Sequence, residues 1–295
     1  MKKFLAYSAA VVAGTVLLAL ANDFANMWFI THSSSSPAYK MQRLFSKEFV
    51  DEIPIVGSSR AQANLVPSLI APNCFNYGLD GEGIGETIFH LEALARKTGG
   101  GISSQPVIVN IDPWGLVAST AEHLVGDYRL APASGKTKLT DRIVGLRFHG
   151  ALRKSITAWL NEKKTVTKKI DNGAVLLLNV RSKEEWAVIN ASQKPSSFSI
   201  DREIYERLVN VLKSLAPRQV YIVVAPCSSR FRELYSGREE MEKFLDDIAK
   251  QPNVSVINCF WNENFTDDDF TDSTHLSSEG AKKYTHYIAS KIDVQ

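Results

Sequence analysis

The chain has little cysteine and almost no excess charge, and each shortage excludes a class of protein. Only three of its 295 residues are cysteines, Cys74, Cys227 and Cys259, too few for a disulfide-stapled scaffold. Cys227 and Cys259 follow apolar runs, so they either pair between neighbouring strands or, as we favour, all three are small buried residues. The formal net charge of +2 does not favour nucleic acid as a partner.

The spacings that mark common metal and cofactor sites are also missing. The glycines within residues 78–85 do not follow the order of a dinucleotide fingerprint, and Gly135-Lys136-Thr137 lacks the leading glycine of a phosphate loop. The acidic run 267–269 has no alternating spacing, so we expect solvated carboxylates rather than calcium ligands. No histidine has a partner at zinc-site spacing. We therefore expect no metal and no cofactor.

An uncharged apolar segment occupies the N-terminus. It runs for 18 residues, 4–21, directly after Lys2 and Lys3, and as a helix it would span about 27 Å, close to the thickness of a bilayer core. The length favours an uncleaved signal anchor, whereas Ala19-Leu20-Ala21 would also fit a cleavage site and a released soluble enzyme. The lysine pair predicts a cytoplasmic N-terminus and an extracytoplasmic remainder.

The rest of the chain alternates apolar runs with helical patterns. We expect strands at 53–56, 74–77, 107–111, 220–225 and 254–257, and helices at 84–95, 204–215 and 241–248. Strands that alternate with helices predict an α/β domain with a parallel sheet covered on both faces. The predicted organisation is an anchor at 1–30, a polar tether at 31–45 and one domain at 46–295.

Residues 118–200 break this alternation, and we interpret them as an insertion or cap of the domain. They contain a helical pattern around 143–159 and a basic stretch. Asp171-Asn172-Gly173 is a turn signal, and the apolar run 174–178 follows it. Such an insertion would shape a substrate site at the carboxyl edge of the sheet.

Two short motifs have the residue types of a serine-hydrolase site. Gly57-Ser58-Ser59-Arg60 follows the first predicted strand, and Asp272-Ser273-Thr274-His275 precedes the last predicted helix. A serine hydroxyl needs a neutral imidazole to take its proton and a carboxylate to orient that imidazole. The alternative is that Ser59 only caps a helix and His275 is an ordinary loop histidine.

These motifs resemble the conserved blocks of the SGNH (GDSL-like) hydrolase superfamily. The run Ile55-Val56-Gly57-Ser58-Ser59 is similar to its strand-Gly-Asp-Ser block, with Ser58 in the aspartate position. Asn76-Tyr77-Gly78-Leu79-Asp80-Gly81 fits its Asn-x-Gly-x-x-Gly block, and Asp272 to His275 fits its last block. The resemblance implies a flavodoxin-like three-layer sandwich with a central, mostly parallel five-stranded sheet. It also implies Ser59, Asp272 and His275 as catalytic residues.

The resemblance further implies that the backbone N–H groups of Ser59 and Gly81 form the oxyanion hole. The third block departs from the family, because Asn110-Ile111-Asp112 stands where Gly-x-Asn-Asp is usual. Asn110 is expected inside a strand, and an ionised Asp112 would repel an oxyanion. Arg60 or the insertion would then supply the third donor. Arg60, Asn110, Asp112 and Trp114 are our candidate substrate contacts.

A Gly-Ser-Ser block behind an N-terminal membrane helix looks most like one divergent branch of this superfamily. That branch includes the lipoteichoic-acid D-alanylation and alginate O-acetylation proteins. The likeness implies an extracytoplasmic esterase or O-acyltransferase for a cell-surface or exported polysaccharide, with a membrane-bound O-acyltransferase as a partner. The altered third block leaves open a catalytically inactive subunit that binds glycan or serves in assembly.

Overall fold

The computed structural model describes residues 1–97, 103–117, 156–157, 159–160, 168–178 and 181–294. Contacts divide the chain into two units, Met1–Phe45 with Gly126–Lys164 and Ser46–Val125 with Thr165–Gln295. The helix predicted around 143–159 lies almost entirely outside the described residues. The same holds for most of the first half of the predicted insertion.

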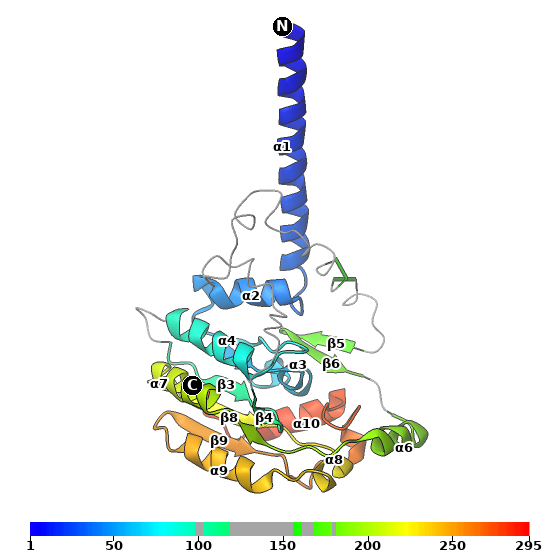
Figure 1. Cartoon of the computed structure of the whole chain (residues 1–295), viewed down its shortest axis with the longest axis vertical. Helices are drawn as coiled ribbons and strands as arrows, with labels where there is room; N and C mark the ends of the chain where they lie inside the picture. Colours follow the sequence, from blue (N-terminus) through cyan, green and yellow to red (C-terminus); the bar gives the residue numbers. More distant parts are fainter. Residues whose placement is uncertain (98–102, 118–155, 158, 161–167, 179–180, 295) are drawn as a thin grey trace. The chain divides into compact units, whose positions relative to one another are not determined.

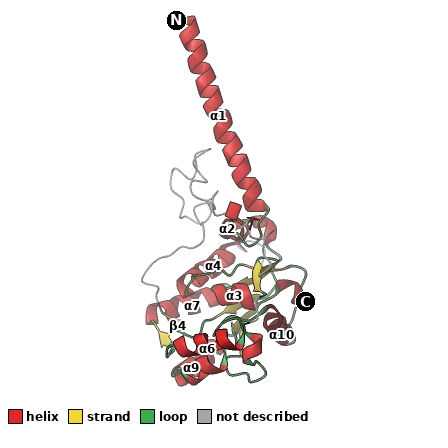
Figure 2. Cartoon of the chain, turned by 90° about the vertical axis from the view of Figure 1, so that its right-hand side faces the viewer, coloured by secondary structure: helices red, strands yellow, loops and turns green. Residues whose placement is uncertain are grey.

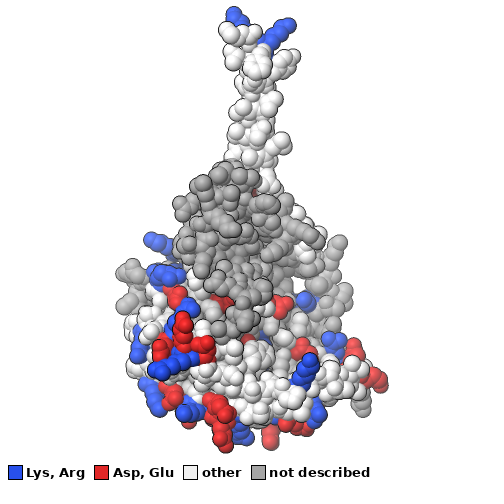
Figure 3. Space-filling model, in the orientation of Figure 1, with Lys and Arg blue, Asp and Glu red and all other residues white. Residues whose placement is uncertain are grey.

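The first unit begins with a long apolar helix, α1 (Lys2–Thr31). An 18-residue window within Lys2–Phe29 has a mean hydropathy of 2.1, and this segment is long and apolar enough to cross a membrane. Large apolar side chains such as Phe4, Leu17 and Leu18 are exposed along it. Figure 3 shows the lysine pair at its tip and an uncharged surface beyond them. One N-terminal helix with the properties of an anchor or a signal is thereby confirmed.

The segment predicted as a polar tether contains a helix, α2 (Pro37–Phe45). Proline suits the first position of a helix because its missing N–H has no intrahelical partner there. Ala38, Met41 and Leu44 recur at helical spacing and are buried. The second half of the predicted tether 31–45 is therefore helical, with an apolar face that was not predicted from the sequence.

The second unit is built on a five-stranded parallel sheet, as predicted. The strand order is β2-β1-β3-β8-β9, and every neighbouring pair is parallel. The bounds are β1 (Ile53–Val56), β2 (Cys74–Asn76), β3 (Val107–Asn110), β8 (Val220–Val224) and β9 (Val254–Asn258). Four of the five strands are completely buried, which explains why they are continuous apolar runs rather than alternating ones.

Helices cover the sheet in two groups (Figures 1 and 2). α3 (Ser59–Asn64) packs against α10 (Ser278–Ala289), and both contribute to the core over Ile55, Ile108 and Val223. α4 (Ile84–Lys97) packs against α7 (Arg202–Ser214), whose Tyr205 ring contacts Phe244 of α9 (Arg238–Ala249). A strand presents side chains on both faces of the sheet, and α4, α7 and α9 cover the face opposite to α3 and α10. The architecture is compatible with a three-layer sandwich.

Short elements complete the unit. The predicted turn joins a hairpin, β5 (Lys168–Asp171) and β6 (Ala174–Leu177). Asn172 and Gly173 take positive φ values of 39° and 87°, as a type I′ turn requires. In the described residues, the remaining elements are β4 (Gly115–Leu116), paired with β7 (Ser199–Ile200), the helices α6 (Lys183–Ser192) and α8 (Ser229–Glu233), and short 3₁₀ turns at Lys47–Phe49, Pro67–Leu69 and Asp267–Asp269.

Candidate active site

Ser59 lies where strand β1 turns into helix α3, at the carboxyl edge of the sheet. Gly57, which makes this turn, has a φ of 144°, a value that side chains other than hydrogen rarely allow. A Cβ atom there would lie 2.9 Å from Cβ of Ala61 and 2.9 Å from the carbonyl oxygen of Asn110. Glycine therefore lets the first turn of α3 approach the end of β3 closely, and this approach fixes the position of Ser59.

Ser58, rather than Ser59, caps helix α3. Its hydroxyl oxygen accepts a hydrogen bond from the Arg60 backbone N–H at 3.2 Å and donates one to Asp112 Oδ1 at 2.9 Å. The cap therefore satisfies the helix terminus with the neighbouring side chain. The Ser59 hydroxyl is left to interact across the site, so the alternative in which Ser59 is only a capping residue was wrong.

Ser59, His275 and Asp272 form a continuous hydrogen-bonded chain. The Ser59 hydroxyl oxygen lies 2.9 Å from His275 Nε2, and His275 Nδ1 lies 2.8 Å from Asp272 Oδ2. The carboxylate only accepts, so Nδ1 carries the proton and Nε2 is free to accept from the serine. This tautomer is the one that a general base for serine needs.

Asp272 holds both the loop and the imidazole. Oδ1 accepts hydrogen bonds from the backbone N–H groups of Thr274 and His275 at 2.9 and 2.8 Å, which shapes the loop. His275 Nδ1 lies 2.8 Å from Oδ2 and 3.1 Å from Oδ1, so the carboxylate also orients the ring. Burial alone would raise the pKa of Asp272, but the hydrogen bonds and charge of His275 and the two backbone donors lower its pKa to about 2. The carboxylate therefore stays ionised at neutral pH, as orientation of an imidazole requires.

Two backbone N–H groups are available at the same edge of the sheet. Ser59 is the first residue of α3, where a helix leaves its N–H without an intrahelical partner. Gly81 follows β2, the neighbour of β1, and is exposed with a φ of 78°. The Leu79 N–H donates to the Gly57 carbonyl at 3.3 Å, so the loop that carries Gly81 is bonded to the turn that precedes Ser59. Among the described residues, neither the Ser59 nor the Gly81 N–H has a hydrogen-bond partner.

The residues of the altered third block interact with one another. Asn110, the last residue of β3, is buried and donates from Nδ2 to Asp112 Oδ1 at 3.2 Å. Burial raises the pKa of Asp112, and the Arg60 charge and the Ser58 hydrogen bond offset this only in part. One N–H of the Asn110 side chain therefore points to Asp112. This bond competes with a role of Asn110 as the third oxyanion donor.

Arg60 does not reach substrate, which corrects its prediction as a substrate contact or oxyanion donor. Its side chain is fully buried. The guanidinium donates to the carbonyl oxygens of Thr274, Ala225 and Pro226 at 3.3, 2.8 and 3.1 Å, and Nη1 lies 3.9 Å from Asp112. Arg60 was predicted as a site residue because it follows the serine motif. Its guanidinium instead binds backbone carbonyls of the loops around the site and has a structural role.

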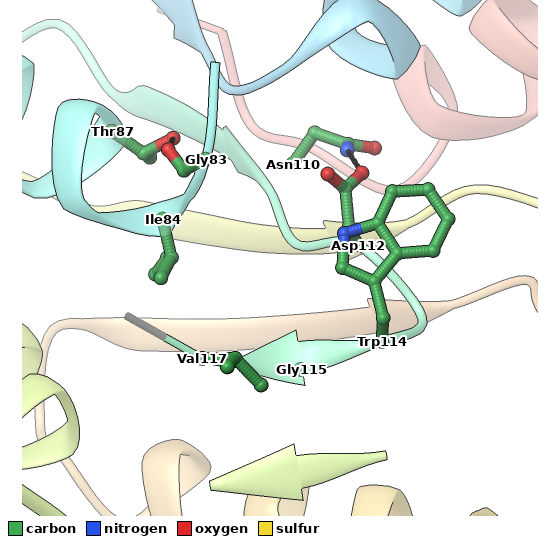
Figure 4. A pocket seen from close by; sticks show the side chains of 8 residues that line it. All are labelled: Gly83, Ile84, Thr87, Asn110, Asp112, Trp114, Gly115 and Val117. Carbon is green, nitrogen blue, oxygen red and sulfur yellow. Dashed lines mark hydrogen bonds between the residues drawn. The ribbon is translucent and has the colours of Figure 1, made fainter. Parts of the chain in front are cut away.

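A hollow open to solvent lies beside this network (Figure 4). Its cavity volume is about 40 Å³. Asn110, Asp112 and Trp114 line one side, and Ile84, Thr87 and Val117 are among the residues of the other. Trp114 is 41% exposed, so the structure places it at the pocket rather than in the core. Asn110, Asp112 and Trp114 thus line one pocket, and their role as substrate contacts stays a prediction.

No metal or redox centre is evident in the parts of the chain that the structure describes. Those residues contain no cluster of three or more histidine, cysteine or acidic side chains that could hold an ion. Asp267 and Asp269 instead accept hydrogen bonds from the backbone N–H groups of Ser229 and Thr266. The three cysteines are unpaired and buried, and burial raises the pKa of each thiol.

Sequence reasoning missed Asn64. This residue ends α3, is fully buried, and contacts the backbone on both sides of His275. Its spacing of five from Ser59 gives no recognisable signal, because its partners lie 210 and 212 positions away. The chemistry assigned to this site rests on its geometry, since neither the models of known protein families nor the curated proteins match this chain.

Proposed function

We propose that the chain is a membrane-anchored serine esterase or O-acyltransferase that transfers acyl groups at Ser59. The observation that carries this proposal is the hydrogen-bonded order Ser59, His275, Asp272, with the histidine in the tautomer that accepts a proton. A capping serine or an isolated loop histidine would not need an ionised carboxylate on the far side of the imidazole. The His275 and Asp272 side chains are 23% and 42% exposed, so a substrate can reach the site.

The first half of the reaction forms an acyl-enzyme. The Ser59 oxygen attacks the carbonyl carbon of an ester while its proton moves to His275 Nε2. Asp272 stabilises the imidazolium that results. When the tetrahedral intermediate collapses, the bond to the alcohol oxygen breaks and the imidazolium returns its proton to that oxygen. The acyl group then remains on Ser59 and the alcohol leaves.

The second half repeats these steps with a new nucleophile. Water or a sugar hydroxyl loses its proton to His275 and attacks the acyl carbon, which restores the Ser59 hydroxyl. Water gives hydrolysis and a sugar hydroxyl gives transfer, and the pocket decides between them by admitting or excluding water. The reaction uses no cofactor.

The negative charge of the intermediate needs preorganised donors. The N–H groups of Ser59 and Gly81, which have no partner among the described residues, are our candidates, because they follow the carboxyl ends of the adjacent strands β1 and β2. Asn110, Asp112 and Trp114 line the pocket and are our candidate substrate contacts, with Asp112 as a hydrogen-bond acceptor and Trp114 as an apolar surface.

The location and the substrate class rest on the N-terminal helix and on the resemblance to the polysaccharide-modifying branch. A helix that spans the bilayer with Lys2 and Lys3 inside would place the second unit outside the membrane. There it would meet cell-surface or exported polysaccharide, in the company of a membrane-bound O-acyltransferase.

Labelling with a fluorophosphonate probe tests the chemistry. We expect an adduct on Ser59 in the full-length chain, none in Ser59→Ala and slow formation in His275→Ala. Acetyl ester turnover with and without a carbohydrate acceptor then separates hydrolysis from transfer. Folded protein that forms no adduct would contradict the proposal.

A second candidate is a glycan-binding or assembly subunit that keeps the fold without the chemistry. The observation that favours it is the bond between Asn110 and Asp112, which engages one of the two N–H groups of the amide expected as a third oxyanion donor. Absence of the adduct, together with saturable binding of a polysaccharide that Trp114→Ala weakens, would favour this candidate.

A further inference from the structure

Helix α3 carries the nucleophile and also holds the base. Ser59 is its first residue and Asn64 its last. Arg60 and Asn64 are four positions apart, so their side chains lie on the same side of the helix. Both are fully buried.

Asn64 brackets His275 through the two peptide groups that flank it. Asn64 Nδ2 donates to the carbonyl oxygen of Thr274 at 3.3 Å, and Asn64 Oδ1 accepts from the Leu276 N–H at 2.9 Å. Arg60 Nε donates to the same Thr274 carbonyl at 3.3 Å. One side-chain amide thus fixes the backbone immediately before and after the imidazole.

The other bonds of this loop run within it or to elements other than α3, including the bond from Arg181 Nε to the Thr271 carbonyl at 2.8 Å. Asp272 Oδ1 binds N–H groups within the loop, and the Thr271 N–H donates to the His275 carbonyl at 2.8 Å. The Ser228 N–H ties Ser273 to the end of β8. In the described part of the chain, α3 hydrogen-bonds to residues 271–276 only through Ser59, Arg60 and Asn64.

We propose that Arg60 and Asn64 are positioning residues that hold His275 in proton-transfer reach of Ser59. This inference rests on the proposed acyl transfer at Ser59. A proton moves efficiently only when donor and acceptor stay within hydrogen-bond distance, and a displacement of about 1 Å can reduce a rate about 100-fold. Without these bonds, the loop keeps its Asp272–His275 pair but drifts from the nucleophile.

The test uses full-length protein in detergent and the variant Asn64→Ala. We expect the rate of fluorophosphonate labelling at Ser59 and kcat for 4-nitrophenyl acetate to fall about 10- to 100-fold, with KM nearly unchanged. Hydrogen exchange at the Leu276 amide should accelerate, because this amide loses its acceptor. Asn64→Asp, which has the same size and keeps the acceptor but loses the donor, should slow labelling as well.

Asn253→Ala is the matched control. Asn253 is also buried, and its Nδ2 donates to the carbonyl oxygens of Leu212 and Arg218, both at 3.1 Å. It precedes β9 at the amino edge of the sheet, away from Ser59. This variant loses two hydrogen bonds of the same kind, so we expect a lower melting temperature with labelling within about twofold of wild type.

A double-mutant cycle separates positioning from general damage. If Asn64 acts through His275, adding Asn64→Ala to His275→Ala should slow labelling no further. A further loss in that background, or an Asn64→Ala protein that labels as fast as wild type, would overturn the positioning role and leave the proposed function intact. A folded wild type that never labels would overturn both.

Discussion

The hydroxyl oxygen of Ser59 lies 2.9 Å from Nε2 of His275, although 216 positions separate the two residues. Ser59 follows strand β1, and His275 lies in the loop after strand β9. These two strands are not neighbours, because β3 and β8 lie between them. The chain after β9 must therefore return along the carboxyl edge of the sheet before α10 packs beside α3. The parallel topology and this return together make the site.

Asp272→Asn tests the orientation of the imidazole. The amide can still accept hydrogen bonds from the loop, but its NH₂ group would face Nδ1 and place the ring proton on Nε2. His275 could then not accept the Ser59 proton, and we expect kcat to fall by about 10³- to 10⁴-fold with the melting temperature little changed. A fall in 4-nitrophenyl acetate turnover of less than tenfold would contradict this role.

Asp112→Asn tests the electrostatic cost of the buried carboxyl. Folding raises the pKa of Asp112, chiefly through burial, so the folded state binds this proton more tightly than the unfolded chain does. The stability that follows is complete below the unfolded pKa and is lost as the pH rises through the folded pKa. An amide cannot ionise but still accepts from Ser58.

We therefore expect the melting temperature of Asp112→Asn, relative to wild type, to increase as the pH rises from the ordinary aspartate pKa of about 3.9 to neutral pH. Asp247→Asn is the control, because Asp247 is exposed on α9 and its pKa is lowered by the Lys250 hydrogen bond. Its difference from wild type should not grow over this range. A constant difference for Asp112→Asn would show that the carboxyl does not resist ionisation.

Gly57→Ala tests the turn that presents Ser59. The added Cβ meets Ala61 and Asn110 at 2.9 Å in a backbone conformation that alanine rarely takes. We expect the free energy of unfolding to fall by about 1–3 kcal/mol and labelling to slow. Gly85→Ala in α4 is the control, because a Cβ there has no neighbour within 4 Å. Urea denaturation of both variants measures the difference, and equal stabilities would refute the requirement for glycine.

Retention of the N-terminal helix tests the anchor. We expect the chain to stay in the membrane fraction after a carbonate wash and its intact mass to include residues 1–21. Protease added to spheroplasts should digest the second unit, because we expect the lysine pair to keep the N-terminus in the cytoplasm. A mature protein that begins at Asn22 would instead identify a cleaved signal and a released enzyme.

The sheet and the turns were predictable because their signals are local. Each central strand is an apolar run whose residues are buried together, and Asp171-Asn172-Gly173 suits a type I′ turn wherever it occurs. The association of Ser59 with Asp272 and His275 was inferred from short motifs in the right strand and helix context. The hydrogen bonds between them agree with that inference, and their catalytic roles stay a prediction.

The errors concern side chains whose partners lie far along the chain. The sequence does not show which of the two serines caps α3, and the structure assigns this role to Ser58. It also does not show that the Arg60 guanidinium donates to carbonyl oxygens more than 160 positions away. Asn64 looks like any asparagine at a helix end. Helix α2 was also not predicted, although its signal is local, because only three apolar residues mark its buried face.

The return of the chain across the sheet edge has a consequence for biosynthesis. Ser59 is synthesised 216 positions before His275. On the proposed mechanism, a nascent or truncated polypeptide that stops before Asp272 would carry a hydroxyl without the partner that activates it. Such prematurely terminated products would be inert, and reactivity would appear only after the loop that carries His275 has been made.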